Sequence, residues 1–345
     1  MNEINVGVIG AGRIGRVHAE NLAYRIPEAN LVAISDVFVA AAEKLAAELP
    51  APPDRPGGVS AYQDHRRILD DPAIDAVLIC SSTDTHARFM EEAAQAGKQI
   101  FCEKPIALDL AAIDRALEVV KQAGVKLQIG FNRRFDPNFR RVHDVVAEGQ
   151  IGQPHVLRIT SRDPLPPPID YVRVSGGIFL DMTIHDFDMA RFLMGQEVES
   201  VYAAAGVMVD PRIGEVGDVD TAVVTLHFVD GSLGVIDNSR QAVYGYDQRV
   251  EVFGSAGVVT ADNNYPNTAM ISDANRVHRD LPLNFFMERY VDSYVNEMRA
   301  FVDCVVNDAP PPVTGLDGRI PVVMGYAAKQ SVAEGRPVRL DEVGG

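Results

Sequence analysis

Cysteine is scarce in this chain, and its positions exclude two classes of protein. Three cysteines, Cys80, Cys102 and Cys304, are spread over 345 residues with no CxxC pair among them. Disulfide scaffolds and cysteine-based metal sites need closely spaced cysteines in larger sets, so neither is predicted. Cys80 and Cys102 end apolar runs, and we expect both to be small buried side chains. The pattern fits a reducing compartment.

The chain also has fewer basic than acidic residues, and it lacks long apolar runs. Lys and Arg number 32 against 48 Asp and Glu, which gives a formal net charge of −16. Nucleic acids and anionic membranes are bound through clustered cations, so neither is expected as a partner. No apolar run approaches the roughly 20 residues of a membrane-spanning helix. No basic leader precedes the first strand, and we expect a cytoplasmic protein.

The first third of the chain alternates short β-rich runs with helical patterns. It opens with a predicted strand at residues 4–9 and a predicted helix at residues 13–24. A continuous apolar run at residues 76–80 is typical of a strand buried on both faces. Repeated strand–helix–strand spacing predicts a parallel, doubly wound sheet, the Rossmann fold.

After about residue 130 the rhythm changes to predicted strands separated by turn signals such as Asp230-Gly231. This spacing favours antiparallel hairpins, and helical patterns flank them. We therefore predict an α/β chain of two domains. Residues 1–128 would form the Rossmann domain, and residues 129–345 an α+β domain with an open, mainly antiparallel sheet.

A glycine motif, GAGRIG, joins the first predicted strand to the first predicted helix. Its first glycine permits a tight turn, the second lets the backbone approach a pyrophosphate, and the third lets the helix pack on the strand. The pyrophosphate would then lie on the amide groups at the helix N-terminus. The cofactor-binding residues predicted from the motif are Gly10, Gly12, Arg13, Ile14 and Gly15.

Asp36 strengthens this prediction, because it ends the second predicted strand. A carboxylate at that place accepts the hydroxyl groups of the adenosine ribose. The same charge repels the 2′-phosphate of NADP, and Val37 supplies no cation to bind it, so NAD is the predicted cofactor. The alternative is a plain glycine turn with a capping Asp.

Polar residues also follow the next two strands of the predicted parallel sheet. Because the carboxyl ends of these strands line the ligand crevice, we expect some of them to contact the cofactor. The hydroxyl groups could equally cap the next helix, and a lysine after a strand is usually solvated. The residues concerned are Ser81, Thr83, His86, Glu103 and Lys104.

Asp181 and His185 stand four residues apart at a predicted helix start, so their side chains would share a face. Oxidation of an alcohol needs a base for the hydroxyl proton, and histidine suits neutral pH. A nearby Lys104 ammonium would stabilise the developing alkoxide. The alternative is a buried, hydrogen-bonded His185 with Asp181 as a cap. A metal site at His185, Asp186 and Asp188 is not predicted, because no second histidine lies at ligand spacing.

Together these motifs resemble the Gfo/Idh/MocA oxidoreductase family. The similarity spans almost the whole chain, through GAGRIGRVHAENL, CEKP, GGIFLDMTIHDFDMARFL and a final GRPV. Within the family the chain is most similar to the inositol dehydrogenases, through SRDP, YGYDQRVEVFGS and MERYVDSYVNEMRAFVD.

The resemblance implies that Lys104, Asp181 and His185 form a catalytic triad, with His185 as the base. It implies oxidation of myo-inositol to 2-keto-myo-inositol with NAD. Arg133, Asp163 and Tyr246 are further candidates for binding substrate hydroxyls. Two of them have a plainer reading: a basic pair at Arg133-Arg134 is more often a solvated face or an interdomain salt-bridge donor, and Tyr246 could be plain packing.

Other functions are compatible with the same motifs. Scyllo-inositol, chiro-inositol and aldoses present similar hydroxyl groups. A non-catalytic nucleotide sensor could keep the fold, although it would be expected to lose the lysine or the histidine. Family members usually associate through the open face of the second sheet. The mixed face at Thr221, Val223, Thr225 and His227 therefore leads us to expect a homotetramer.

Overall fold

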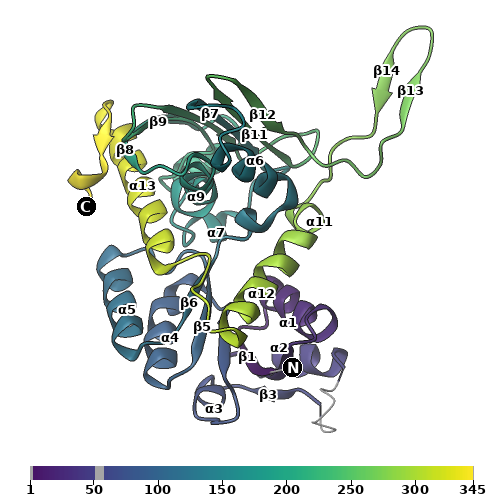
Figure 1. The fold of residues 1–345 in the computed structure, drawn as a ribbon, viewed down its shortest axis with the longest axis vertical. Coiled ribbons are helices and arrows are strands. Elements are labelled where there is room, and N and C mark those ends of the chain that lie inside the picture. Colours follow the sequence, from purple (N-terminus) through teal and green to yellow (C-terminus); the bar gives the residue numbers. More distant parts are fainter. Residues whose placement is uncertain (1–2, 51–57, 345) are drawn as a thin grey trace. The chain divides into compact units, whose positions relative to one another are not determined.

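The computed structural model describes residues 3–50 and 58–344 (Figure 1). The chain divides into two compact units. One comprises Met1–Asn132 with Asp292–Ile320, and the other comprises Arg133–Val291 with Pro321–Gly345. The first boundary falls close to the predicted residue 128, but a segment near the C-terminus returns to the first unit. Within the described residues, no helix is long and apolar enough to cross a bilayer.

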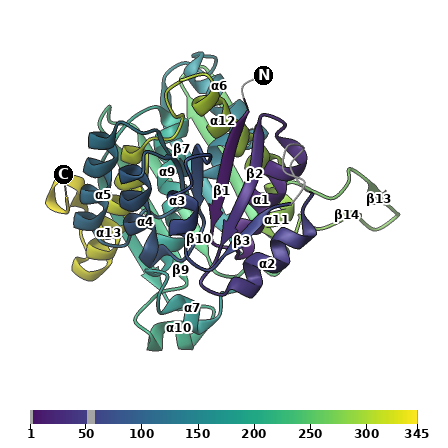
Figure 2. The same ribbon diagram turned by 90° about the horizontal axis from the view of Figure 1, so that it is seen from below.

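The first unit is built on a six-stranded parallel sheet, in the order β3-β2-β1-β4-β5-β6 (Figure 2). The predicted doubly wound sheet is thereby confirmed. Its strands are β1 (Ile4–Ile9), β2 (Ala29–Ser35), β3 (Ser60–Tyr62), β4 (Ala76–Ile79), β5 (Gln99–Glu103) and β6 (Leu127–Gly130). All four residues of β4 are buried, as expected for a central strand covered on both faces.

Helices cover this sheet on both faces. They are α1 (Arg13–Arg25), α2 (Val39–Glu48), α3 (Arg66–Leu69), α4 (Thr83–Gln95), α5 (Leu110–Ala123), α12 (Val291–Val306) and the first turns of α13 (Gly315–Glu334). Local sequence explains where α5 begins and ends: the Asp109 side chain accepts from the Ala112 amide, and Gly124 ends the helix in the left-handed conformation. Phe301 of α12 joins the core formed by α1, α2 and the sheet, so this helix completes the first unit.

The strand order reverses between β1 and β4. From β1 the chain moves outward to β2 and β3, and it then returns to β4 on the other side of β1. In doubly wound sheets, ligands bind at the carboxyl ends of the strands at such a reversal. The glycine motif follows β1 and Ser81 lies just after β4, so both predicted cofactor segments start at this point.

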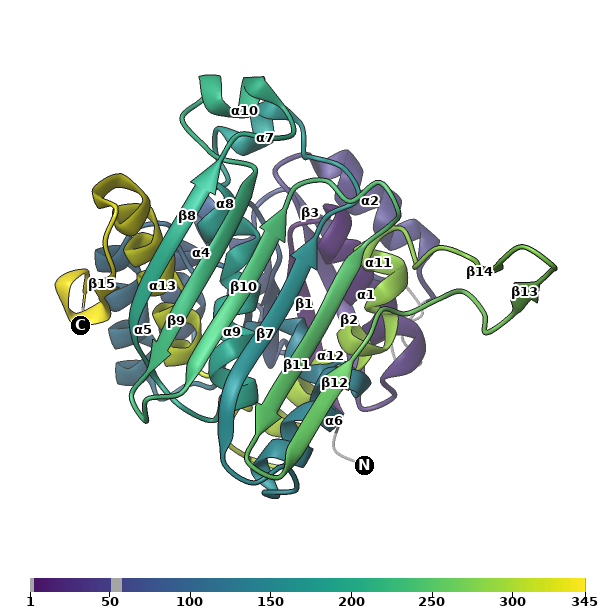
Figure 3. The same ribbon diagram turned by 90° about the horizontal axis from the view of Figure 1, so that it is seen from above.

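The second unit contains a seven-stranded sheet, in the order β12-β11-β7-β10-β9-β8-β15 (Figure 3). β7 and β10 pair in parallel, and every other neighbouring pair in this sheet is antiparallel, as predicted. The strands are β7 (Pro154–Arg162), β8 (Val198–Gly206), β9 (Thr221–Phe228), β10 (Leu233–Ser239), β11 (Asp247–Gly254), β12 (Gly257–Ala261) and β15 (Val338–Arg339).

One face of this sheet is apolar and the other is open. In β9 the alternate residues Ala222, Val224, Leu226 and Phe228 are buried, as the two-residue period predicts. Helices α6 and α9 pack against the strands on the buried side. The second-unit helices are α6 (Pro137–Ala147), α7 (Ile169–Val172), α8 (Ile178–Asp181), α9 (Thr183–Met194), α10 (Pro211–Glu215), α11 (Phe286–Arg289) and residues 321–334 of α13, with 3-10 turns η1 (Asn132–Phe135) and η2 (Leu340–Glu342).

A two-stranded hairpin was not predicted from the sequence. β13 (Met270–Ser272) pairs with β14 (Val277–Arg279), and every residue of both strands is exposed. Figures 1 and 3 show the hairpin projecting from the sheet of its unit.

Candidate active site

The three motif glycines of the turn after β1 differ in the space around them. Gly10 has a φ of +107°, and a Cβ there would lie 2.6 Å from the backbone of Cys80. At Gly15 a Cβ would lie 1.9 Å from the Gly10 carbonyl oxygen. Gly12 differs, because among the described residues no atom lies within 4 Å of the Cβ position. Gly10 and Gly15 therefore serve the fold, whereas Gly12 keeps space open at the start of α1.

Asp36 is fixed beside this turn, immediately after β2. Its Oδ2 accepts a hydrogen bond from the Ala11 amide at 2.8 Å, and its Oδ1 accepts from the Phe38 amide at 2.9 Å. Val37 and Phe38 are 71% and 77% exposed, and neither carries a cation. An open glycine turn, a helix N-terminus and a carboxylate at the end of β2 together fit NAD.

The segment after β4 is held by its own hydrogen bonds. Ser81 Oγ lies 2.6 Å from Thr85 Oγ1, which donates to the Ser82 carbonyl at 2.7 Å. His86 is buried, with its ring nitrogens 3.0 Å from the Ser81 carbonyl oxygen and 2.9 Å from that of Pro105. His86 therefore ties the loop after β4 to the loop after β5. Thr83 begins α4 and is half-buried.

Glu103 ends β5 and lies in the core of the first unit. Its Oε1 is 2.7 Å from Nε2 of His18, a fully buried residue of α1. The buried Glu297 of α12 lies beside this pair. One possible metal-ligand atom from each of His18, Glu103 and Glu297 lies within 4.8 Å of the other two. The distance between His18 and Glu103 is that of a direct hydrogen bond, so this pair is satisfied without an ion between its two atoms. Lys104 is the next residue along the chain and is half-buried.

In the second unit, Asp181 and His185 occupy two consecutive short helices rather than one helix start. Asp181 is the last residue of α8, and His185 lies in the first turn of α9, with Met182 between the helices. Met182 keeps a right-handed helical backbone, with φ −98° and ψ −60°. Both Asp181 and His185 are half-buried.

Arg240 joins Asp181 to Asp163, and the sequence patterns did not indicate this residue. The Arg240 guanidinium forms ion pairs with Asp181 Oδ2 at 3.0 Å and with Asp163 Oδ2 at 3.5 Å. The Tyr171 hydroxyl donates to Asp181 Oδ1 at 2.8 Å. Burial raises the pKa of Asp163 to about 6, with Arg240 opposing and Asp181 adding to the rise. Asp163 and Asp181, two predicted substrate residues, are therefore parts of one cluster.

Arg133 is buried and Arg134 is half-buried, and both donate to aspartates within the second unit instead of forming a solvated face. Arg133 donates to Asp186 at 2.6 Å, and Arg134 donates to Asp188 at 2.6 Å. The other terminal nitrogen of Arg133 lies 3.4 Å from the hydroxyl of Tyr246, which is buried. Asn238 also donates to Asp186, at 2.8 Å. The carboxylates considered for a metal site thus accept from these side chains.

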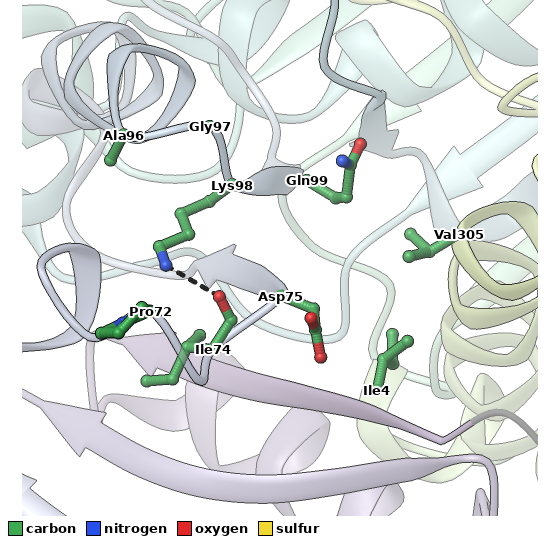
Figure 4. Close-up of a pocket in the computed structure, with 9 residues that line it drawn as sticks. All are labelled: Ile4, Pro72, Ile74, Asp75, Ala96, Gly97, Lys98, Gln99 and Val305. Atoms are coloured by element: carbon green, nitrogen blue, oxygen red, sulfur yellow. Dashed lines mark hydrogen bonds between the residues drawn. The ribbon is translucent and has the colours of Figure 1, made fainter.

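Figure 4 shows a pocket in the first unit, formed around residues at the amino ends of its strands. The Lys98 ammonium donates to the carbonyl oxygens of Asp71 and Ile74, at 2.6 and 2.8 Å. Ile4 at the start of β1 and Gln99 at the start of β5 also line it. Ligands of doubly wound sheets bind at the opposite, carboxyl ends of the strands, so we assign no function to this pocket.

A glycine turn at the switch point of a doubly wound sheet, with a carboxylate beside it at the end of β2, is the arrangement of a dinucleotide-binding domain. Comparison with known proteins agrees: residues 4–131 match the oxidoreductase family with an NAD-binding Rossmann fold. Residues 139–260 match the GFO/IDH/MocA C-terminal domain. The chain belongs to the GFO/IDH/MocA oxidoreductase family, which confirms the resemblance.

Individual relatives are similar over nearly their whole length. The chain is 54% identical over 340 residues to myo-inositol 2-dehydrogenase of Thermotoga maritima, covering 99% of each chain. It is 45% identical to inositol 2-dehydrogenase of Rhizobium meliloti, covering 98% of this chain and 99% of that one. A solved structure of scyllo-inositol dehydrogenase from Lactobacillus casei, with bound NAD(H) and scyllo-inositol, superposes with a TM-score of 0.90. That protein is 30% identical, with coverage of 98% and 99%.

Proposed function

We propose that the protein oxidises a secondary alcohol of an inositol with NAD, and that its substrate is myo-inositol, which becomes 2-keto-myo-inositol. The observation that carries this proposal is the 54% identity to a myo-inositol 2-dehydrogenase along 99% of both chains. The polar cluster in the second unit supports it. A ring with several hydroxyl groups is best recognised by several fixed acceptors and donors, since each missing hydrogen bond is costly in a buried site.

In this proposal His185 is the general base that takes the proton of the reacting hydroxyl group. Lys104 stabilises the negative charge that develops on the oxygen, and Asp181 accepts a hydrogen bond from the substrate or from the imidazole. NAD, when bound, accepts the hydride from the carbinol carbon. The joint action of the three residues is proposed from the family resemblance.

Arg133, Asp163 and Tyr246 are proposed to bind the remaining hydroxyl groups. Asp163 is the best placed by its exposure, since its side chain is 26% exposed and lies beside Asp181 through Arg240. Arg133 is committed to Asp186, so we propose that it acts on substrate mainly by orienting the Tyr246 hydroxyl group.

The test is NADH formation with a panel of myo-, scyllo- and chiro-inositol and several aldoses, each offered NAD and NADP. We expect the largest kcat/KM with myo-inositol and NAD. If the protein oxidises only another polyol, the substrate assignment would be overturned, but the assignment as an NAD-dependent oxidoreductase would stand.

Scyllo-inositol is the second candidate substrate, because the related Lactobacillus casei enzyme was solved with it. Substituting Lys104 by Met or His185 by Gln tests the proposed roles of these residues: each variant should keep NAD binding and lose turnover by about 10²–10⁴-fold.

We also propose that the protein is a homotetramer that associates through the open sheet face of the second unit. Apolar side chains on this sheet are partly exposed, among them Tyr202, Val223 and Phe253 at 40%, 49% and 49%. Light scattering should give four times the chain mass of 37.5 kDa, and a monomeric mass would overturn the proposal. A cytoplasmic location stays a prediction.

A further inference from the structure

Arg240 is a buried cation whose role is set by its neighbours. It directly follows the last residue of β10, and its backbone amide donates to the Asp220 carbonyl oxygen at 2.8 Å. Only 4% of its side chain is exposed. A buried guanidinium is costly unless carboxylates compensate it, and here two carboxylates do so, Asp163 and Asp181.

The guanidinium lies between these two carboxylates and forms an ion pair with each of them. One terminal nitrogen pairs with Asp181 and the other pairs with Asp163. Tyr171 secures the second oxygen of Asp181 at 2.8 Å, so both Asp181 oxygens have a partner on a different element. Partial burial and the neighbouring Asp181 raise the pKa of the Tyr171 hydroxyl, which therefore remains a donor.

We propose that Arg240 is a positioning residue, which sets the spacing and direction of the Asp163 and Asp181 carboxylates so that they accept two hydroxyl groups of the same polyol. The inference rests on the proposed function and adds a specificity determinant to it. Arginine suits this task because its planar fork presents donors in two fixed directions, which an ammonium group cannot do.

Arg133 cannot replace Arg240 in this role, although it is also near Asp163 and buried. Its Nη1 donates to Asp186 at 2.6 Å, and Asn238 holds the other oxygen of that carboxylate at 2.8 Å. Each buried arginine thus serves its own carboxylates, and loss of Arg240 leaves Asp163 and Asp181 facing each other without their shared cation.

The protonation of Asp163 reports on this arrangement. The charged and titratable groups that face it are Arg240, Asp181, Arg133, Tyr171 and Tyr246. With Arg240 present, burial raises the pKa of Asp163 to about 6. Removal of Arg240 takes away a cation that lowers this pKa and leaves the Asp181 charge, which raises it. The acidic limb of log kcat/KM for the polyol should therefore lie near pH 6 and move to higher pH when Arg240 is lost.

The experiment compares Arg240→Met and Arg240→Lys with Arg140→Met. Arg140 is a matched control, because it is an arginine of α6 with a 56% exposed side chain that pairs with Asp144, and α6 lies on the side of the sheet away from the proposed interface. We expect Arg240→Met to lower kcat/KM for myo-inositol at least 100-fold, to leave the KM for NAD within twofold, and to move the acidic limb upward by about one pH unit. Arg240→Lys keeps the positive charge but not the planar guanidinium, so its kcat/KM should lie between that of Arg240→Met and that of the wild type. Asp163→Asn should leave an acidic limb that is set by the base His185, and that limb should no longer move when Arg240 is also replaced by Met.

A crystal structure of Arg240→Lys gives a readout that does not depend on turnover. We expect the Asp181 carboxylate to leave the Tyr171 hydroxyl group in this variant. The positioning role would be overturned if the wild type turns over myo-inositol, both Arg240 variants keep its kcat/KM and pH profile, and Asp181 does not move. The proposed function would then still stand. A wild-type enzyme silent on every polyol would overturn the proposed function, and the position of Asp181 would still decide whether Arg240 places it.

Discussion

At the scale of single residues, Asp36 is the residue that we propose sets the preference for NAD. Its carboxylate is fixed by the amides of Ala11 and Phe38, and exposed apolar residues follow it. We predict that Asp36→Asn raises the KM for NAD about tenfold or more, since a hydrogen bond to a charged group contributes about 1.5–3 kcal/mol. The variant should also discriminate less against NADP.

Steady-state kinetics with both cofactors measures this effect. Asp70→Asn is the matched control, because Asp70 is an exposed carboxylate of the same unit. An unchanged ratio of kcat/KM for NAD over NADP in Asp36→Asn would show that the carboxylate does not contact the ribose.

The His18–Glu103 pair governs stability at the same scale. His18→Leu would leave the Glu103 carboxylate in the core without its 2.7 Å partner. Loss of a buried hydrogen bond to a charged group costs about 1.5–3 kcal/mol, which corresponds to a fall in Tm of about 6 °C for a domain of this size. Differential scanning calorimetry tests this against His155→Leu, a substitution of an exposed histidine. A Tm within about 2 °C of wild type would contradict the role given to the pair.

Sequence patterns predicted some of these residues and missed others for a physical reason. Gly10, Gly15 and Asp36 were predicted because their roles follow from local backbone geometry and from distance along the chain. Arg240 was missed because its partners are Asp163 and Asp181, which lie far from it in sequence and meet it only in the folded unit. Its position after a strand gives no local signal of burial.

The same limit applies to Arg133 and Arg134. As a basic pair after a strand they read as a solvated face, yet each pairs with a buried aspartate more than 50 residues away along the chain. Which carboxylate satisfies a buried arginine is decided by tertiary packing, and a single sequence does not contain that pairing in any local form.

At the scale of elements, the turn from β1 to α1 separates fold from function. Gly15→Ala would place a methyl group 1.9 Å from the Gly10 carbonyl oxygen, so the helix must shift. At Gly12, with φ −72°, an added methyl group meets no described atom within 4 Å. We predict that Gly15→Ala lowers the Tm by several degrees, whereas Gly12→Ala keeps the wild-type Tm and weakens NAD binding at least tenfold.

Calorimetry and titration calorimetry with NAD measure the two effects separately, and each glycine variant is the control for the other. NAD affinity unchanged in Gly12→Ala would mean that the pyrophosphate does not approach this part of the turn.

Elements with a strong period were predicted best. The alternation in β9 and the parallel strands of the first unit were confirmed. Burial on one face requires an apolar residue at every second position, and burial on both faces requires a continuous apolar run, so both leave a clear pattern in the sequence. The α8–α9 junction and the β13–β14 hairpin were not predicted. A helix of four residues is too short to show a period, and the hairpin strands have three residues each, all exposed.

At the scale of the whole molecule, neither compact unit is a single continuous stretch of the chain. α12 lies near the C-terminus, yet Met298, Phe301 and Val302 pack into the core of the first unit. A long-range return of this kind has no signal in local composition, and for this reason a boundary near residue 128 was predicted but the return was not.

The central proposal is oxidation at one carbon of myo-inositol with NAD as the acceptor. The most direct measurement uses myo-inositol deuterated at carbon 2 and follows the isotope in the products by mass spectrometry. We predict that the deuterium appears in the reduced nicotinamide cofactor and that the sugar product is 2-keto-myo-inositol. Unlabelled NADH, formed at a rate unaffected by the deuterium, would show that a different carbon is oxidised and would contradict the proposal.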